Sequence, residues 1–121
     1  MKYLLMIYHD ERRWKELSDA EIQQMYGEFG KLREELQSKG RFLGGAQLQP
    51  TITATSVRIR DGKDLVTDGP FAETHEQLGG YFLVDVQNAD EAIAIAKQIP
   101  LSRTGTIEVR ALVERASEAN A

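Results

Sequence analysis

Residues 66–81, VTDGPFAETHEQLGGY, are the stretch around which the rest of this chain can be organised. Turn-forming residues, an aromatic side chain and several ionisable groups are crowded together in it. Runs rich in β-branched and aromatic residues lie on both sides, so we expect one strand to enter the stretch and another to leave it. The remaining sequence then forms a small α+β scaffold that positions this loop.

The segment before this stretch has the pattern of a β-hairpin. Residues 51–60 alternate along their length, with β-branched side chains on one face and arginines on the other. The pair Asp61-Gly62 follows, and it favours a type I′ turn, in which both positions have positive φ. Residues 63–67 are the expected returning strand. Their polar character predicts an edge or protruding hairpin.

Four main strands and two helices are predicted outside the hairpin. The strands are residues 2–8, 41–48, 80–86 and 105–113, and the helices are residues 19–38 and 89–99. Ser18 and Glu21 form a capping-box pattern at the start of the first helix. Residues 12–17, with the single tryptophan Trp14, are expected to be a loop. The order strand–helix–strand, hairpin, strand–helix–strand predicts two split βαβ halves, the ferredoxin-like arrangement.

Two helices can cover only one face of such a four-stranded sheet. The apolar residues that we expect on the uncovered face are Leu4, Met6, Phe82, Val84 and Val86. Exposed apolar patches of this size usually mark an interface. We therefore predict a symmetric homodimer in which the two sheets pack face to face.

Length and composition set further expectations. A chain of 121 residues fits one domain, which we place at residues 1–113, with the small and polar residues 114–121 as a flexible C-terminal tail. The absence of cysteine excludes disulfides, thiolate catalysis and cysteine-based metal sites. The net charge is −4 and basic residues are scattered, so direct nucleic-acid binding is not expected.

The cytoplasm is the expected compartment, without membrane attachment. A strand that begins at Lys2 leaves no room for a signal peptide, and no apolar run is long enough to span a bilayer.

The core DGPFAET at residues 68–74 resembles the signature of the DGPF family, which belongs to the YCII-related group. Four supporting segments occur in the expected order: KYLLMIYHDE at 2–11, RFLGGAQLQP at 41–50, EQLGGYFLVDV at 76–86 and GTIEVR at 105–110. The similarity covers nearly the whole chain. It implies a ferredoxin-like fold that dimerises as an α+β barrel, in agreement with the pattern above.

The resemblance implies two different roles. The wider group is thought to contain an enzymatic pocket with a His–Asp pair, and similar members are linked with extracytoplasmic-function sigma factors. The helical histidine of that pair has no counterpart here, because residues 19–38 contain no histidine. Asp68 can stand for the acidic member, and its partner would be His9 or His75.

Three ionisable residues are the candidate catalytic groups. Asp68 either holds the Asp-Gly-Pro turn through backbone hydrogen bonds or acts as a general acid–base. His75 is either a solvated loop histidine or a general base oriented by Glu73 or Glu76. His9 lies just past the end of the first strand, where sites commonly collect, and its alternative is again a structural role.

The remaining candidates would bind a ligand. They are Gly69, Pro70, Phe71, Glu73, Thr74 and Tyr81. A metal site has no supporting ligand spacing, and no phosphate-binding glycine motif indicates a nucleotide, so no cofactor is expected.

Two functions from different classes follow. The first is a dimeric protein with a small-molecule pocket near the DGPF loop, which as an enzyme would perform cofactor-independent acid–base chemistry. The alternative is a non-catalytic interaction or regulatory module associated with a sigma factor. The residues leave open whether the protein is an enzyme.

Overall fold

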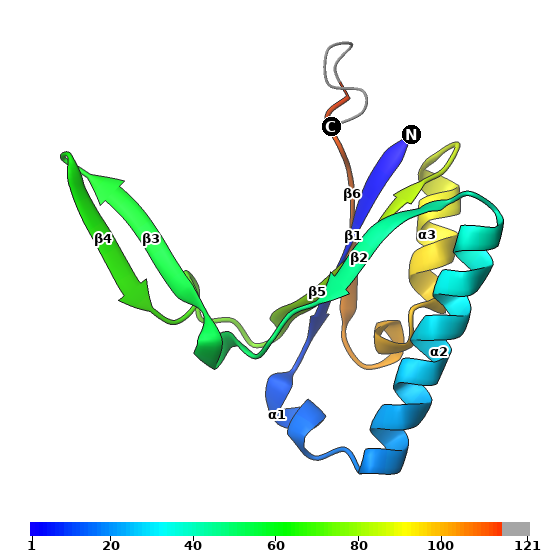
Figure 1. The fold of residues 1–121 in the computed structure, drawn as a ribbon, viewed down its shortest axis with the longest axis horizontal. Coiled ribbons are helices and arrows are strands. Elements are labelled where there is room, and N and C mark those ends of the chain that lie inside the picture. The colour runs from blue at the N-terminus through cyan, green and yellow to red at the C-terminus, as the bar shows by residue number, and fades with distance from the viewer. Residues whose placement is uncertain (115–121) are drawn as a thin grey trace.

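The computed structural model describes residues 1–114 (Figure 1). The predicted tail, apart from Glu114, lies outside the described residues. In chain order the elements are β1 (Lys2–His9), α1 (Glu11–Lys15), α2 (Asp19–Ser38), β2 (Phe42–Gln47), β3 (Thr55–Arg60), β4 (Lys63–Asp68), β5 (Gln77–Asp85), α3 (Ala89–Gln98) and β6 (Thr106–Ala111). Short 3₁₀ turns occupy Thr51–Thr53 and Pro100–Arg103.

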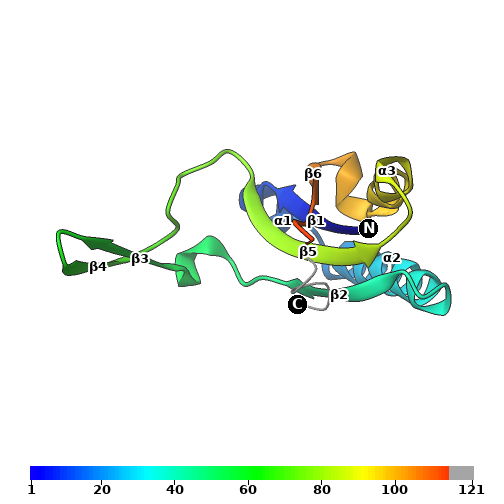
Figure 2. The ribbon, with the colours of Figure 1, turned by 90° about the horizontal axis from the view of Figure 1, so that it is seen from above.

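The predicted ferredoxin-like topology is confirmed. One sheet has the strand order β2-β5-β1-β6 with antiparallel neighbours, and β3 pairs with β4 in a separate two-stranded sheet. In each of the units β1-α2-β2 and β5-α3-β6, one strand of the other unit lies between the two strands. This is the split βαβ arrangement. Helices α2 and α3 lie side by side on one face of the sheet (Figures 1 and 2).

The core forms between this face and the two helices. Alternate residues of β1 and β5 are buried in it, together with residues of α2 and α3: Tyr3, Leu5, Ile7, Phe82, Val84, Leu32, Leu36, Ala92 and Ile95. Burial of these side chains is the main stabilising contribution of the fold. Val86, directly after β5, joins the same cluster.

The prediction for the uncovered face was wrong for Phe82, Val84 and Val86. The register pairs Leu5 with Phe82, and residues opposite each other on neighbouring strands share a face. Phe82 therefore lies with Leu5 in the core. Leu4 and Met6 do lie on the uncovered face, opposite Leu83 and Tyr81.

The segment before α2 also departs from the prediction. Residues 12–17 were expected to be a loop, yet α1 begins at Glu11 and carries Trp14. The Asp10 carboxylate caps this helix by accepting a hydrogen bond of 2.9 Å from the backbone N–H of Arg12. The predicted capping box of α2 is present, with reciprocal bonds between Ser18 and Glu21.

Strands β3 and β4 form an arm that projects away from the sheet and helices (Figures 1 and 2). We use "the arm" for residues 55–68. Its tip is the predicted two-residue turn, since φ is 53° at Asp61 and 74° at Gly62. Within residues 1–114 the structure has no helix that is both long and apolar enough to cross a membrane.

Truncation of Leu5 tests the core. Leu5→Ala removes a fully buried side chain, so we expect the free energy of unfolding in urea to fall by about 2–5 kcal/mol. Ile93→Ala, on the exposed side of α3, is the matched control and should change it by less than about 1 kcal/mol. Equal losses in the two variants would contradict this core.

Candidate functional site

A cavity of about 360 Å³ lies between the helices and the ends of three strands. Its walls come from β1, α1, α2, β2, β5 and the residues that follow β2. The side chains that give it chemical character are His9, Glu11, Trp14, Lys15, Tyr26, Phe29, Arg33, Gln47 and Phe82. Its volume falls in the range of small-molecule sites, about 300–1,000 Å³. We call it the His9 cavity.

A β-bulge gives His9 its place in this cavity. The register of β1 and β5 pairs Ile7 with Gly80 but Tyr8 with Leu78, so Gly79 is an extra residue without a partner in β1. Bulges of this kind re-aim side chains and are frequent beside functional sites. A Cβ atom on Gly79 would fall on the His9 imidazole. Only glycine at position 79 therefore lets the ring lie where it does.

The environment of His9 favours the neutral imidazole. Burial lowers the pKa of His9 below its ordinary value of 6.5, against the opposing charges of Glu11, Asp10 and Glu76. The Trp14 ring meets it edge-on, with ring centroids 5.5 Å apart. Among residues 1–114, neither ring nitrogen hydrogen-bonds to another side chain or to the backbone. A neutral imidazole with free nitrogens can accept a proton or a hydrogen bond from a ligand.

The one carboxylate in the cavity lining is already engaged. Glu11 accepts 2.8 Å hydrogen bonds from both the backbone N–H and the hydroxyl of Thr51, one on each carboxylate oxygen. These bonds tie the segment after β2 to α1. The cations of the lining, Lys15 and Arg33, make no ion pair with any described residue. The walls of the cavity are thus mainly apolar, and the charged groups in its lining that remain without an ion-pair partner among the described residues are cations.

The DGPF segment lies at the root of the arm and does not contribute to the lining of the His9 cavity. Asp68 ends β4 opposite Thr55 and is exposed. Gly69 has a φ of 98°, and its backbone N–H donates to the carbonyl of Ala54 at 2.7 Å. Positive φ explains why glycine follows Asp68.

Pro70 and Phe71 instead line a separate groove along β3. The Phe71 side chain is 76% exposed, and the Arg58 guanidinium lies 5.0 Å from its ring centroid. Phe71 therefore does not anchor this loop in the core. The loop is held by backbone hydrogen bonds and this cation–π contact instead.

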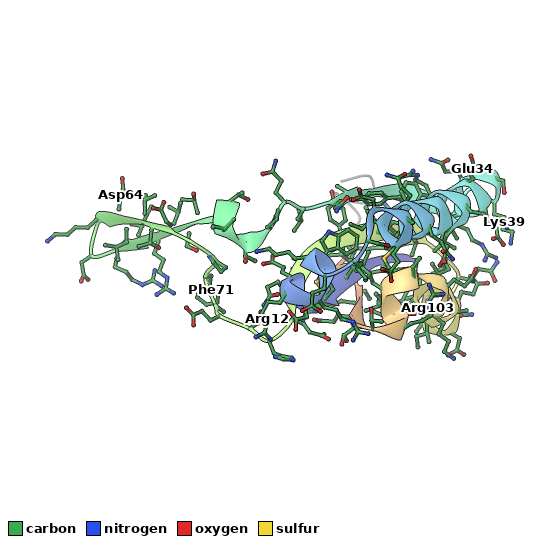
Figure 3. The ribbon with its side chains drawn as sticks, turned by 90° about the horizontal axis from the view of Figure 1, so that it is seen from below. Arg12, Glu34, Lys39, Asp64, Phe71 and Arg103 are labelled. Atoms are coloured by element: carbon green, nitrogen blue, oxygen red, sulfur yellow. The ribbon has the colours of Figure 1, made fainter. Side chains whose placement is uncertain are left out.

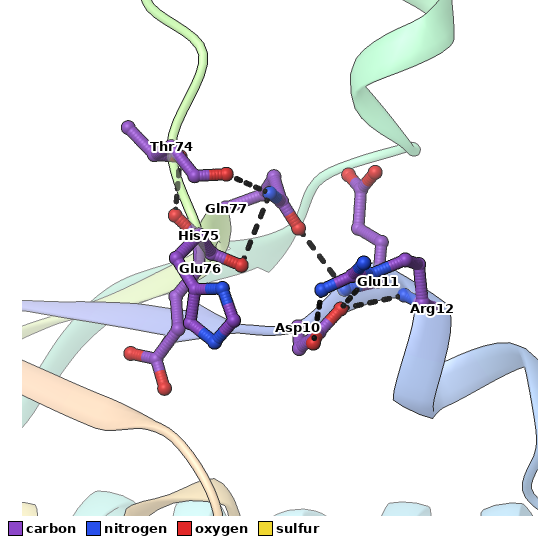
Figure 4. A network of polar contacts seen from close by, with 7 residues as sticks. All are labelled: Asp10, Glu11, Arg12, Thr74, His75, Glu76 and Gln77. Carbon is purple, nitrogen blue, oxygen red and sulfur yellow. Dashed lines mark hydrogen bonds and ion pairs between the residues drawn. The ribbon is translucent and has the colours of Figure 1, made fainter.

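Glu73, Thr74 and His75 lie in the exposed loop that returns to β5. Gln77 connects this loop to α1: its amide nitrogen donates to the Thr74 carbonyl at 2.6 Å, and its amide oxygen accepts from the Glu11 N–H at 3.0 Å (Figure 4). Hydrogen bonds from Arg12 are the main cause of the lowered pKa of the Asp10 carboxyl. His75 is close enough to Asp10 to contribute to the same lowering. His75 is outside the cavity lining.

Tyr81, the last predicted ligand-binding residue, lies on the uncovered face of the sheet, opposite Met6. Of the predicted catalytic residues, the structure therefore brings only His9 to the cavity. Asp68, His75 and the predicted ligand-binding residues line other surfaces. Among residues 1–114, no group of three or more His, Asp or Glu side chains has the arrangement of a metal site.

Several residues of the cavity lining were not predicted from the sequence to belong to a functional site. Tyr26, Phe29 and Arg33 follow the i, i+3, i+7 spacing of one helix face, but helical spacing alone does not indicate that a face borders a cavity. Trp14 was missed because α1 was not predicted. Gly79-Gly80 lies in the segment EQLGGYFLVDV, in which no residue pattern indicates that Gly79 faces His9.

Comparison with known proteins places the chain in a family. A model of the YCII-related domain matches residues 1–116. The chain belongs to the YCII-related family. An uncharacterised protein of Rhizobium meliloti (strain 1021) is 34% identical to this YCII-related chain over 114 residues, which cover 93% of the chain and 92% of that protein. The resemblance identified from the sequence is thereby confirmed at the level of the family.

Gly79→Ala tests the contact between the bulge and His9. The added methyl group meets the imidazole, so we expect the free energy of unfolding to fall by about 1–3 kcal/mol. In a His9→Ala background the space is free, and the same substitution should cost much less. Urea denaturation of the four proteins in this double-mutant cycle measures the difference. Equal costs in both backgrounds would show that position 79 does not constrain His9.

The protonation of His9 is a second test. The chain has two histidines, so ¹⁵N-edited NMR can follow each ring, with His75→Asn assigning the signals. We expect the His9 ring to titrate with a midpoint below 6.5 because burial opposes its charge. A midpoint at or above 6.5 would contradict the buried, neutral state.

The same shift predicts a pH dependence of stability. The unfolded state takes up a proton at His9 near pH 6.5, before the folded state does, so the free energy of unfolding should fall as pH drops through and below that value. His9→Gln should remove part of this fall in urea melts. An unchanged pH profile in the variant would contradict it.

Proposed function

We propose that this YCII-related protein binds a small, mainly apolar molecule with an anionic group in the His9 cavity. The observation that carries the proposal is the His9 imidazole itself, half-buried, free of hydrogen-bond partners and fixed between Gly79 and Trp14. Concave apolar sites with a few convergent polar groups and a perturbed ionisable residue are the usual form of small-molecule sites.

The lining indicates the character of the ligand. Trp14, Tyr26 and Phe29 offer aromatic surface to a ring or short hydrocarbon. Lys15 and Arg33 supply positive charge, whereas the carboxylate of Glu11 is fully used by Thr51. An anionic group, such as a carboxylate, fits this balance better than a cationic one.

The chemistry that we propose for His9 is proton transfer without a cofactor. A neutral imidazole accepts a proton from the bound molecule, and the resulting imidazolium is favoured by the charges of Glu11, Asp10 and Glu76. Burial and these carboxylates act in opposite directions, which keeps the cost of protonation moderate. His9 would thus serve as general base, and its conjugate acid would return the proton.

The face-to-face homodimer stays a prediction. It is supported by the apolar residues on the uncovered side of the sheet: Leu4, Met6, Tyr81 and Leu83. The regulatory alternative, with a sigma factor as partner, uses the same fold and needs no occupied cavity. Asp68 and His75 keep their predicted roles only if a ligand contacts the loop that bears them.

A thermal-shift screen against small carboxylates and their neutral amides tests the proposal. A ligand at about 100 times its dissociation constant should stabilise the folded protein by roughly 2.7 kcal/mol. We expect carboxylates with a ring to shift the melting temperature, and His9→Gln and Arg33→Gln to reduce that shift. Lys31→Gln, an exposed cation on α2 outside the cavity lining, is the matched control and should behave as the wild type.

Other outcomes separate the alternatives. A shift that survives His9→Gln but disappears in Asp68→Asn would move the site to the DGPF loop. No shift with any member of the panel, from a folded protein, would favour the non-catalytic role.

A further inference from the structure

The two faces of the arm differ in chemistry. Cross-strand pairs share a face, and the pairs Thr55–Asp68, Val57–Val66 and Ile59–Asp64 occupy one of them. We call this the acidic face: an apolar centre with a carboxylate towards each end. The opposite face contains Ser56, Arg58, Arg60, Lys63, Leu65 and Thr67, and is basic.

Among residues 1–114, the acidic face is left largely uncovered by its own chain. Val57, Ile59 and Val66 are 67%, 64% and 62% exposed. Figure 3 shows Asp64 and Phe71 far from Glu34, Lys39 and Arg103 on the body. An isolated two-stranded hairpin is marginal in water, and clustered exposed apolar side chains on it indicate a binding surface.

The rim of the His9 cavity is complementary to this face. Tyr26 and Leu48, which line the cavity, are 43% and 42% exposed. Lys15 and Arg33 lie on the same lining, are exposed and have no ion-pair partner among the described residues. The acidic face of the arm is apolar with carboxylates at its ends, and the rim of the cavity is apolar with cations. The two surfaces are therefore complementary in charge and in hydrophobic character.

Within one chain the structure holds these two surfaces apart. The segment from Gln47 to Pro50 lines the cavity, and the arm continues from it away from the body (Figure 1). A second copy of the chain can supply what each surface lacks. In a two-fold pair, a contact of the arm with the rim is made twice, because each copy carries both surfaces.

The uncovered face of the sheet fits the acidic arm less well. Glu108 and Arg110 on its β6 edge pair with each other, and Asp85 at the end of β5 pairs with the N-terminal ammonium. The charge of the arm therefore selects the cavity rim over the sheet face.

We propose that the acidic face of the arm docks on the His9 cavity rim of a second copy of this chain. Asp64 and Asp68 then face Lys15 and Arg33 of that copy, and Val57, Ile59 and Val66 cover Tyr26 and Leu48. The arm of one copy closes the cavity of the other, so that each site is completed by both copies.

Analytical ultracentrifugation of matched arm variants tests the proposal. Val66→Lys places an ammonium in the centre of the acidic face, and we expect the dimer dissociation constant to rise by about tenfold or more. Thr67→Lys adds the same charge one residue away on the basic face, and should leave the constant within about threefold of the wild-type value. Near-ultraviolet circular dichroism verifies that the body remains folded, since the arm is not part of the core.

Disulfide formation between copies locates the contact, because the natural chain has no cysteine. Val66→Cys and Leu48→Cys chains of different mass are mixed and oxidised, and a mixed disulfide is expected. Thr67→Cys with Leu48→Cys is the control and should form much less. A wild-type protein that is monomeric at about 50 μM would overturn the proposal, as would a Val66→Lys dimer of wild-type affinity, or equal cross-linking in the two mixtures.

Charge reversal provides a further check on the same contact. Asp64→Lys should weaken the dimer, and Lys15→Glu or Arg33→Glu in the same chain should restore part of the loss. Absence of any restoration by either reversal would contradict the proposed pairing of charges.

Discussion

The antiparallel pairing of β1 with β5 is the interaction on which both the core and the cavity depend. Between Leu5 and Phe82 it places apolar side chains of both strands under the helices. Two residues further along β1 the same pairing breaks register at Gly79, and the strand carries His9 past the bulge into the cavity. One ladder therefore stabilises the protein at its centre and positions His9 in the cavity at its end.

Much of the fold could be predicted from local chemistry. The capping box at Ser18, the positive-φ turn at Asp61-Gly62 and the helical spacing of α2 and α3 all depend on residues close in sequence. The face that Phe82 occupies could not be predicted in this way, because an apolar strand has two faces of similar composition and only the register with β1 distinguishes them. The short helix α1 was not predicted because it has no apolar periodicity, and its N-cap Asp10 is not part of a capping box.

The candidate site was predicted only in part, for a related reason. His9 could be found because it ends a strand, but the cavity around it combines Trp14, Tyr26, Gln47 and Gly79 from separate elements. The DGPF stretch stands out in the sequence because its turn-forming and ionisable residues are concentrated in a few positions. In the structure that chemistry shapes the root of the arm: the positive φ of Gly69 and the Arg58–Phe71 contact are both local. Membership of the YCII-related family agrees with the fold and leaves the ligand open.

Backbone-amide NMR with a ring-bearing carboxylate is the most direct test of the central claim, that the cavity at His9 is the functional site. The account predicts that saturable shift changes concentrate at His9, Gly79 and Gly80 and at Arg33 on α2. Changes confined to residues 68–75, with the amides of the cavity unmoved, would contradict it and make the DGPF loop the binding site.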